Sequence, residues 1–128
     1  MVDTNICIYA MRGRLLSLSQ QFEDRRAEIV ISAITRAELD YGAAKSERPT
    51  KSRKALEAFL ADLLVLPFDA PAAAHFGDIK ARLFRAGMPC GPLDMLIGAH
   101  ARSAGLTLVT NNRREFDRMP GLTVENWV

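Results

Sequence analysis

Short β-branched or aliphatic runs alternate with longer amphipathic segments along the whole chain, and this alternation limits the fold more than any other feature. Strand-like runs are expected at Val2, Ile29–Ile31, Leu64–Leu66, Leu106–Val109 and Leu122–Trp127. Strands that are separated by helices are joined by right-handed crossovers, which makes neighbouring strands parallel. The sequence therefore predicts an α/β layer sandwich with a mostly parallel sheet and helices on both faces.

The intervening segments carry helical periodicity. Over Thr50–Leu63, the apolar residues Leu56, Phe59, Leu60 and Leu63 follow the i, i+3, i+4, i+7 pattern. Further helices are expected over Asn5–Arg12 with Gly13 at its end, over Leu15–Arg26 and Thr35–Lys45, from Asp69 and Pro71 to Gly87, from Gly91-Pro92 to near Gly105, and as a short turn over Arg114–Arg118.

Composition narrows the class of protein. With 128 residues, 48% of them hydrophobic and 25% charged, the chain is expected to form one globular domain over residues 1–128. No apolar run approaches the roughly 20 residues of a membrane helix, and the start of the chain does not match a signal peptide. The cysteines Cys7 and Cys90 are too few for a disulfide framework, so a cytoplasmic location is expected.

The net charge of +2 is too small to indicate a nucleic-acid binder by itself. Its distribution is uneven, however, because basic residues gather in two groups. The two groups are Lys45, Arg48, Lys51, Arg53 and Lys54, and Arg113 with Arg114. A solvated helix end and loop would have the same composition. The pattern therefore leaves open whether these residues bind nucleic acid or are simply solvated.

Three acids stand at predicted strand ends or helix starts. Asp3 follows the first strand, Glu38 is expected in the first turn of the Thr35–Lys45 helix, and Asp94 in the first turn after Gly91-Pro92. In open α/β sheets, ligands bind outside the carboxyl ends of the strands, so these acids are expected to converge at one edge. Asn112, with Glu115 close behind it, is a fourth candidate for the same edge.

Each acid also has a purely structural interpretation. Asp3 could cap the following helix, Thr35 and Glu38 have the spacing of a capping box, and Asp94 could be a favourable charge at a helix N-terminus. If the acids do converge, a hard divalent cation such as Mg²⁺ would relieve their repulsion. A cation held this way polarises a phosphoryl oxygen, which suits phosphodiester hydrolysis.

Four strings, in order and spacing, resemble the motifs of PIN-domain ribonucleases and, within them, of the VapC toxins of bacterial toxin–antitoxin pairs. The resemblance covers essentially the whole chain. The strings are Val2-Asp3-Thr4-Asn5, Ile31–Leu39 followed by Tyr41-Gly42-Ala43, Gly91–Ile97 followed by Ala99-His100-Ala101, and Leu108–Asn112 followed by Arg114-Glu115-Phe116.

The resemblance implies a PIN-like three-layer α/β/α sandwich and an endoribonuclease that uses Mg²⁺, with Mn²⁺ as a substitute. It implies Asp3, Glu38 and Asp94 as catalytic metal ligands, and Asn5 and Thr110 as supporting residues. Many PIN domains have Asp where this chain has Asn112, so Asn112, Glu115 or a water remains open for the fourth position. The implied partners are a VapB-like antitoxin that inhibits the enzyme, RNA, and a second copy of the chain in a homodimer or a larger toxin–antitoxin assembly.

The basic residues expected at the RNA backbone are Arg36, Lys45, Arg113 and Arg114. His100 is interpreted as a packed histidine, and Phe59, Phe76 and Phe84 as core or dimer-interface residues. The alternative functions are a related flap-type DNA nuclease, an aspartyl-phosphate enzyme built on Asp3, and a non-catalytic binding module.

Overall fold

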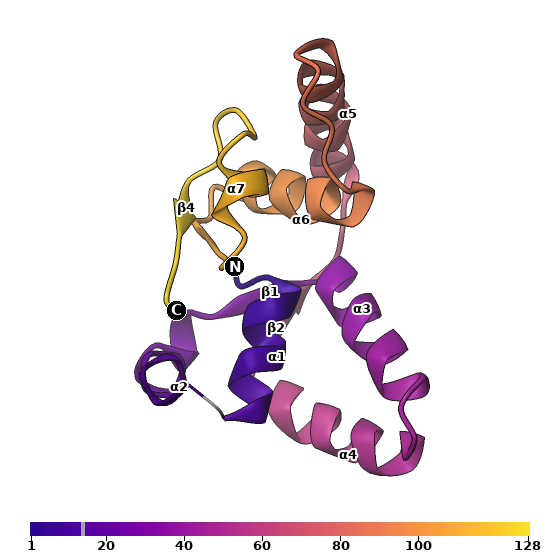
Figure 1. Ribbon diagram of the computed structural model, residues 1–128, viewed down its shortest axis with the longest axis vertical. Coiled ribbons are helices and arrows are strands. Elements are labelled where there is room, and N and C mark those ends of the chain that lie inside the picture. The colour runs from indigo at the N-terminus through magenta and orange to yellow at the C-terminus, as the bar shows by residue number, and fades with distance from the viewer. Residues whose placement is uncertain (14) are drawn as a thin grey trace.

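The computed structural model describes residues 1–13 and 15–128 and contains short strands separated by helices (Figure 1). In chain order the elements are α1 (Thr4–Arg12), α2 (Leu16–Asp24), the 3₁₀ turn η1 (Arg26–Glu28), β1 (Val30–Ser32), α3 (Ala33–Ala44), α4 (Pro49–Leu60), β2 (Leu64–Leu66), α5 (Ala70–Arg85), α6 (Pro92–Ser103), β3 (Leu108–Val109), α7 (Arg113–Phe116) and β4 (Val124–Glu125).

All paired strands run parallel. β1 pairs with β2, and β3 pairs with β4. The first residues of the chain join the two pairs, because the Val2 N–H donates to the carbonyl of Val30 and the Asp3 N–H donates to that of Val109, each at 3.0 Å. Val2 also forms a parallel bridge with Val109. The resulting order is β2, β1, the Met1–Asp3 segment, β3 and β4, which confirms the predicted parallel arrangement.

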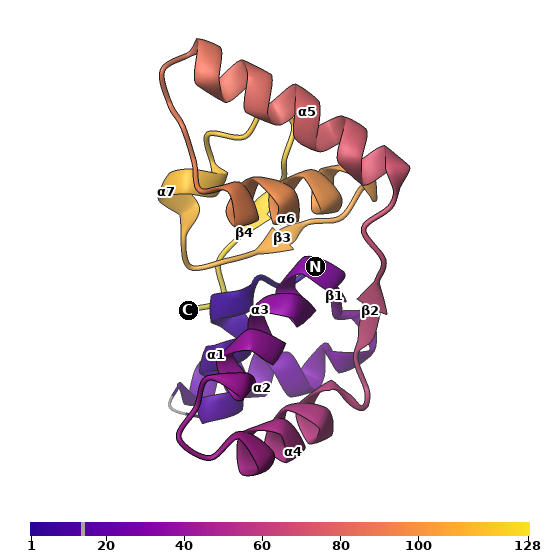
Figure 2. The same ribbon diagram turned by 90° about the vertical axis from the view of Figure 1, so that its right-hand side faces the viewer.

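The helices cover both faces of these strands. α5 and α6 lie on one side, and α1 to α4 lie on the other (Figures 1 and 2). Adjacent strand residues point to opposite faces, so Val2 and Val109 enter the core beneath α1 while Met1 and Leu108 enter the core beneath α6. The three-layer α/β/α sandwich predicted from the sequence is confirmed.

Helix ends follow the expected chemistry at several points. Gly13 ends α1 with a φ of 62°, in the left-handed region that glycine adopts without steric cost. The Asp69 side chain caps α5 by accepting a hydrogen bond from the Ala72 N–H at 3.1 Å. α6 begins at Pro92, which suits a first helical position, and this keeps Asp94 in the first turn as predicted.

The predicted start of α3 is wrong. The helix begins at Ala33, where Ser32 is the N-cap and its Oγ accepts from the Ile34 N–H at 3.0 Å. Thr35 is therefore a buried residue inside the helix, and the expected capping box with Glu38 does not form. Glu38 lies in the second turn of α3 rather than in the first, so its carboxylate can face a neighbouring element.

Other boundaries also differ by two or three residues. β3 and β4 are only two residues long each, shorter than the predicted Leu106–Val109 and Leu122–Trp127. His100 is 3% exposed and packs as predicted, with its Nδ1 2.8 Å from the Oγ of Ser32. Phe59 packs against the core, whereas Phe84 is 52% exposed and lies outside it. Among the helices of the described ranges, none has the length and hydropathy that a bilayer span requires.

Candidate functional site

Asp3 lies where the first strand-like segment ends and α1 begins. Its Oδ1 accepts a hydrogen bond from the Ile6 N–H at 2.9 Å, so the predicted helix cap is present. Its Oδ2 accepts a hydrogen bond from the hydroxyl of Thr110. The side chain is only 4% exposed, and this burial is the main reason why its pKa is raised. The nearby charge of Glu38 raises the pKa further, against the lowering effect of the two hydrogen bonds.

Thr110 links Asp3 to the loop that follows β3. While its hydroxyl donates to Asp3, its Oγ1 accepts from the backbone N–H of Asn112 at 2.9 Å. Thr110 is fully buried, so its rotamer is fixed by both contacts. Asn112 thus contributes a backbone N–H that orients Thr110, and it precedes α7 as the N-cap residue.

Glu38 reaches the same edge from α3. Its Oε1 accepts a hydrogen bond from the Oγ1 of Thr4 at 2.7 Å. Because Thr4 is the residue after Asp3, this contact ties the second-turn carboxylate of α3 to the start of α1. The charge of Glu38 raises the pKa of both Asp3 and Asp94, so it lies near enough to affect both carboxyl groups.

Asp94 shares its surroundings with a second acid. Partial burial, a hydrogen bond with the carboxyl group of Glu115 and the charges of neighbouring acids raise the pKa of Asp94 to about 6. The contributing charges are those of Glu115, Glu38 and Asp3, in that order of effect. The structure therefore brings four carboxyl groups to one edge, and the fourth is Glu115 rather than a residue at position 112.

These acids shift one another's pKa values but do not form a compact group of metal ligands. Within residues 1–13 and 15–128, no three side chains of His, Cys, Asp or Glu are close enough to form a ready-made metal site. The donor set nevertheless consists only of carboxylate and hydroxyl oxygens, which are the ligands of Mg²⁺. Mg²⁺ keeps several waters and uses one or two carboxylates, so it does not require a tight protein cage. The residues present fit such an ion.

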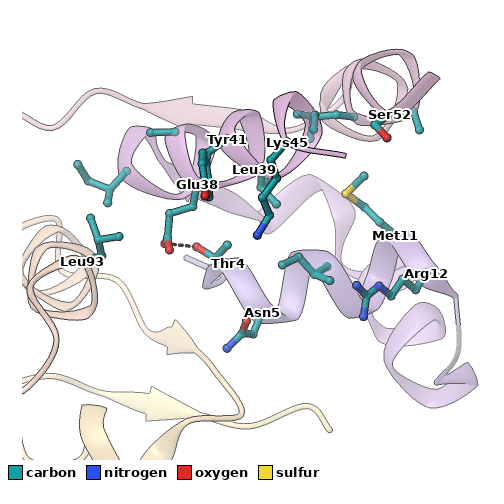
Figure 3. Close-up of a pocket in the computed structure, with 17 residues that line it drawn as sticks. Thr4, Asn5, Met11, Arg12, Glu38, Leu39, Tyr41, Lys45, Ser52 and Leu93 are labelled. Carbon is teal, nitrogen blue, oxygen red and sulfur yellow. Dashed lines mark hydrogen bonds between the residues drawn. The ribbon is translucent and has the colours of Figure 1, made fainter. Parts of the chain in front are cut away.

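A groove of about 820 Å³ opens beside the acids, between α1, α3 and α4 (Figure 3). Thr4, Glu38 and Leu93 line it near the carboxyl groups, and Lys45 and Ser52 line its other end (Figure 3). Asn5, the predicted supporting residue, is exposed and lines the same groove. A groove of this kind can hold an extended polymer beside the acids.

The basic residues expected to contact RNA are not equally available. Arg36 is paired with Asp40 at 3.0 Å and with Glu57 at 2.7 Å, and Arg113 is paired with Asp117 at 3.2 Å. Exposed pairs of this kind are weak and can exchange partners. Lys45, by contrast, lines the groove directly.

The sequence does not single out Thr4 as a site residue. It is the residue that fixes Glu38, yet only its place between the two polar residues Asp3 and Asn5 could have indicated this role. The contact between Asp94 and Glu115 was also beyond sequence reasoning, although Glu115 was a candidate, because it depends on how α6 and α7 pack.

Comparisons with known proteins are consistent with this geometry. Residues 1–122 match the PIN domain family. The chain is 46% identical to the tRNA(fMet)-specific endonuclease VapC of Shigella flexneri, over 99% of this chain and 96% of that protein. It is 48% identical to ribonuclease VapC2 of Haemophilus influenzae, over 100% of this chain and 97% of that protein. Among solved structures, it resembles the DNA-bound VapBC complex of Salmonella typhimurium, with a TM-score of 0.96 and 44% identity over 100% of this chain and 97% of the other.

Proposed function

This chain belongs to the PIN-domain family and, within it, to the VapC ribonuclease toxins of toxin–antitoxin pairs, and on that premise we propose that it hydrolyses RNA with Mg²⁺ at the edge formed by Asp3, Glu38 and Asp94. The observation that carries the proposal is geometric: the buried Asp3, oriented by the Ile6 N–H and Thr110, lies next to Glu38, which Thr4 holds at the edge of the groove. Acids that raise one another's pKa are destabilising when charged, and a bound cation would relieve that repulsion.

Asp3 and Asp94 would bind the cation directly, and Glu38 would bind it directly or through water. Glu115 is the fourth acid in this proposal because its carboxyl group contacts Asp94, and Asn112 acts through its backbone on Thr110. When bound, Mg²⁺ would polarise the scissile phosphate and acidify an attacking water, and Mn²⁺ would substitute for it.

The surrounding residues then act as supports. Thr110 and the Ile6 N–H hold the Asp3 carboxylate in one orientation, and Thr4 does the same for Glu38. Supporting hydrogen bonds of this kind typically change metal affinity or activity by about 10- to 100-fold when they are removed. The products would carry 5′-phosphate and 3′-hydroxyl ends.

The names of the relatives suggest the substrate and the partner. A relative that is 46% identical is called a tRNA(fMet)-specific endonuclease, so tRNA(fMet) is the first RNA to test. Solved complexes of similar chains are VapBC assemblies, so a VapB-like antitoxin is the proposed inhibitor. A homodimer, or a larger assembly with the antitoxin, is the proposed oligomeric state.

The test is cleavage of tRNA(fMet), of other tRNAs and of single-stranded DNA by purified protein, with Mg²⁺, with Mn²⁺ or with a chelator. We expect metal-dependent cleavage of RNA, and a loss of more than about 100-fold in Asp3→Asn and Asp94→Asn, because both remove a proposed ligand. Asp78→Asn is the matched control, since Asp78 lies on α5 and pairs with Arg102. Full activity in chelator would refute the metal site. Preferential cleavage of DNA would favour the flap-type nuclease. Absence of Mn²⁺ binding, measured separately by calorimetry, would favour a non-catalytic binding module.

A further inference from the structure

Three side chains of α3 and its C-cap residue line the groove one after another. Glu38, Tyr41 and Lys45 are spaced i, i+3 and i+7, which places them on the same side of a helix. All three line the groove, with Glu38 at the carboxylate end (Figure 3). Any polymer that lies in the groove with a reactive bond near Glu38 therefore passes Tyr41 and then Lys45.

Tyr41 has no evident structural task. Its side chain is 65% exposed, and it belongs to neither of the two hydrophobic cores. The ammonium group of Lys45 lies over one face of this ring, 5.0 Å from its centre, so a base would stack on the opposite face. An exposed aromatic face beside a cation is the arrangement that single-stranded nucleic-acid binders use, with the base stacked on the ring and the phosphate paired with the charge.

The charge beyond Lys45 favours a polyanion. Arg48, Lys51, Arg53 and Lys54 continue the basic series around the turn into α4. In the part of the chain that the structure describes, none of these four residues, nor Lys45, forms an ion pair.

We propose that Tyr41 and Lys45 form a subsite for an unpaired nucleotide of the RNA substrate, next to the scissile bond. The subsite rests on the proposed ribonuclease function and adds a substrate feature to it. The base stacks on the Tyr41 ring and its phosphate pairs with Lys45, while the unpaired cations of the following turn attract the rest of the strand. A base inside a duplex has no exposed face for the ring, so the subsite selects single-stranded or looped RNA.

The test is binding of a fluorescein-labelled single-stranded RNA of mixed sequence, measured by fluorescence anisotropy in chelator so that no cleavage occurs. Tyr41→Ala should weaken binding by about tenfold, because the loss of one base stacked on an aromatic side chain typically weakens binding by about 5- to 100-fold. Tyr41→Phe keeps the ring and should restore most of the binding. Both substitutions change an exposed helical residue, so the fold should be retained.

Lys45→Gln should reduce the slope of log affinity against log salt by about 0.7, the value for one lost phosphate contact to a single strand, and Lys45→Arg should keep the slope. The matched control is Lys80→Gln on α5, because the Lys80 ammonium also lies beside an aromatic ring, 5.4 Å from Phe84, but outside the groove. Lys80→Gln should bind RNA like the wild type. Double-stranded RNA of the same length should bind with no dependence on Tyr41.

Unchanged RNA binding in both Tyr41→Ala and Lys45→Gln would overturn the subsite. If these variants instead lose binding to a VapB-like antitoxin and keep RNA binding, the groove is a protein-docking site and the subsite is wrong. These outcomes are separate from those of the proposed function, which is tested by metal-dependent cleavage of RNA by the wild-type protein. The binding measurement decides the subsite in either case.

Discussion

Asp94→Asn should make the metal-free protein more stable while it abolishes cleavage. In the folded protein, burial, the contact with Glu115 and the neighbouring charges raise the pKa of Asp94 from its ordinary value of 3.8 to about 6. Above that pH the folded state therefore holds a carboxylate in surroundings that disfavour its charge. Asparagine has nearly the same shape and no charge, so it removes this penalty at neutral pH.

The size of the effect follows from the two pKa values. A rise from 3.8 to about 6 corresponds to roughly 3 kcal/mol of destabilisation above the higher value. Asp94 is only half-buried, so water screens part of it and roughly 1.5 kcal/mol is the better expectation. For a chain of this size, that difference raises the melting temperature by roughly 5 °C.

The pH dependence has a definite sign. Because the folded pKa is raised, the contribution of Asp94 to stability is present below about pH 3.8 and is lost as the pH rises through about 6. The gain in stability of Asp94→Asn over the wild type should thus be near zero at about pH 4 and reach its maximum above pH 6. It should also disappear when Mg²⁺ is added, since the ion stabilises only the wild-type site.

The assay is thermal unfolding followed by circular dichroism in chelator, from pH 4 to pH 8, for wild type and variant. Asp78→Asn is the control, because the pKa of Asp78 is shifted in the opposite direction. Pairing with Arg102 lowers this pKa, so removing the charge of Asp78 should not stabilise the fold. If Asp94→Asn melts at or below the wild-type temperature at pH 8 in chelator, the charged Asp94 carboxylate does not destabilise the metal-free fold.

Further substitutions test the supports of the site and of the fold. Thr110→Val should cost about 1–3 kcal/mol and weaken metal binding about 10- to 100-fold, because Asp3 loses its buried donor; Thr110→Ser should retain both properties in urea unfolding and Mn²⁺ calorimetry. Gly98→Ala should destabilise the fold by about 1 kcal/mol in urea, since its new Cβ would meet the buried side chain of Met119 and helix propensity offsets only part of that clash; an increase in stability would contradict the packing. Ser32→Ala should cost about 1–2 kcal/mol, because it removes the cap of α3 and a buried hydrogen bond, and unchanged unfolding would show that the cap contributes little.

The sequence predicted the layers of the fold well because hydrophobic periodicity and the residues that begin or end helices depend on local sequence. β2 was predicted at its observed bounds, and Gly13 and Asp69 ended and began helices as expected. The predicted start of α3 was wrong because two residues can each serve as the N-cap of this helix. Ser32 and Thr35 can each cap a helix, and only the pairing of β1 with β2 makes Ser32 the last strand residue.

The sequence predicted that the acids lie close together, and their role as metal ligands stays a prediction. The convergence of Asp3, Glu38 and Asp94 followed from the rule that parallel strands end at one edge, and their mutual effects on pKa agree with it. The partners of these acids could not be predicted, because the contacts of Thr4 with Glu38 and of Asp94 with Glu115 join segments that are distant in the chain.

The most direct test of the central claim is a crystal structure of the protein soaked in Mn²⁺, with the ion located by its anomalous scattering. We predict a peak about 2.1 Å from carboxylate oxygens of Asp3 and Asp94, with water in several of the remaining positions. A peak bound elsewhere, or no peak at a Mn²⁺ concentration that supports full RNA cleavage, would contradict the assignment of these acids as the metal site.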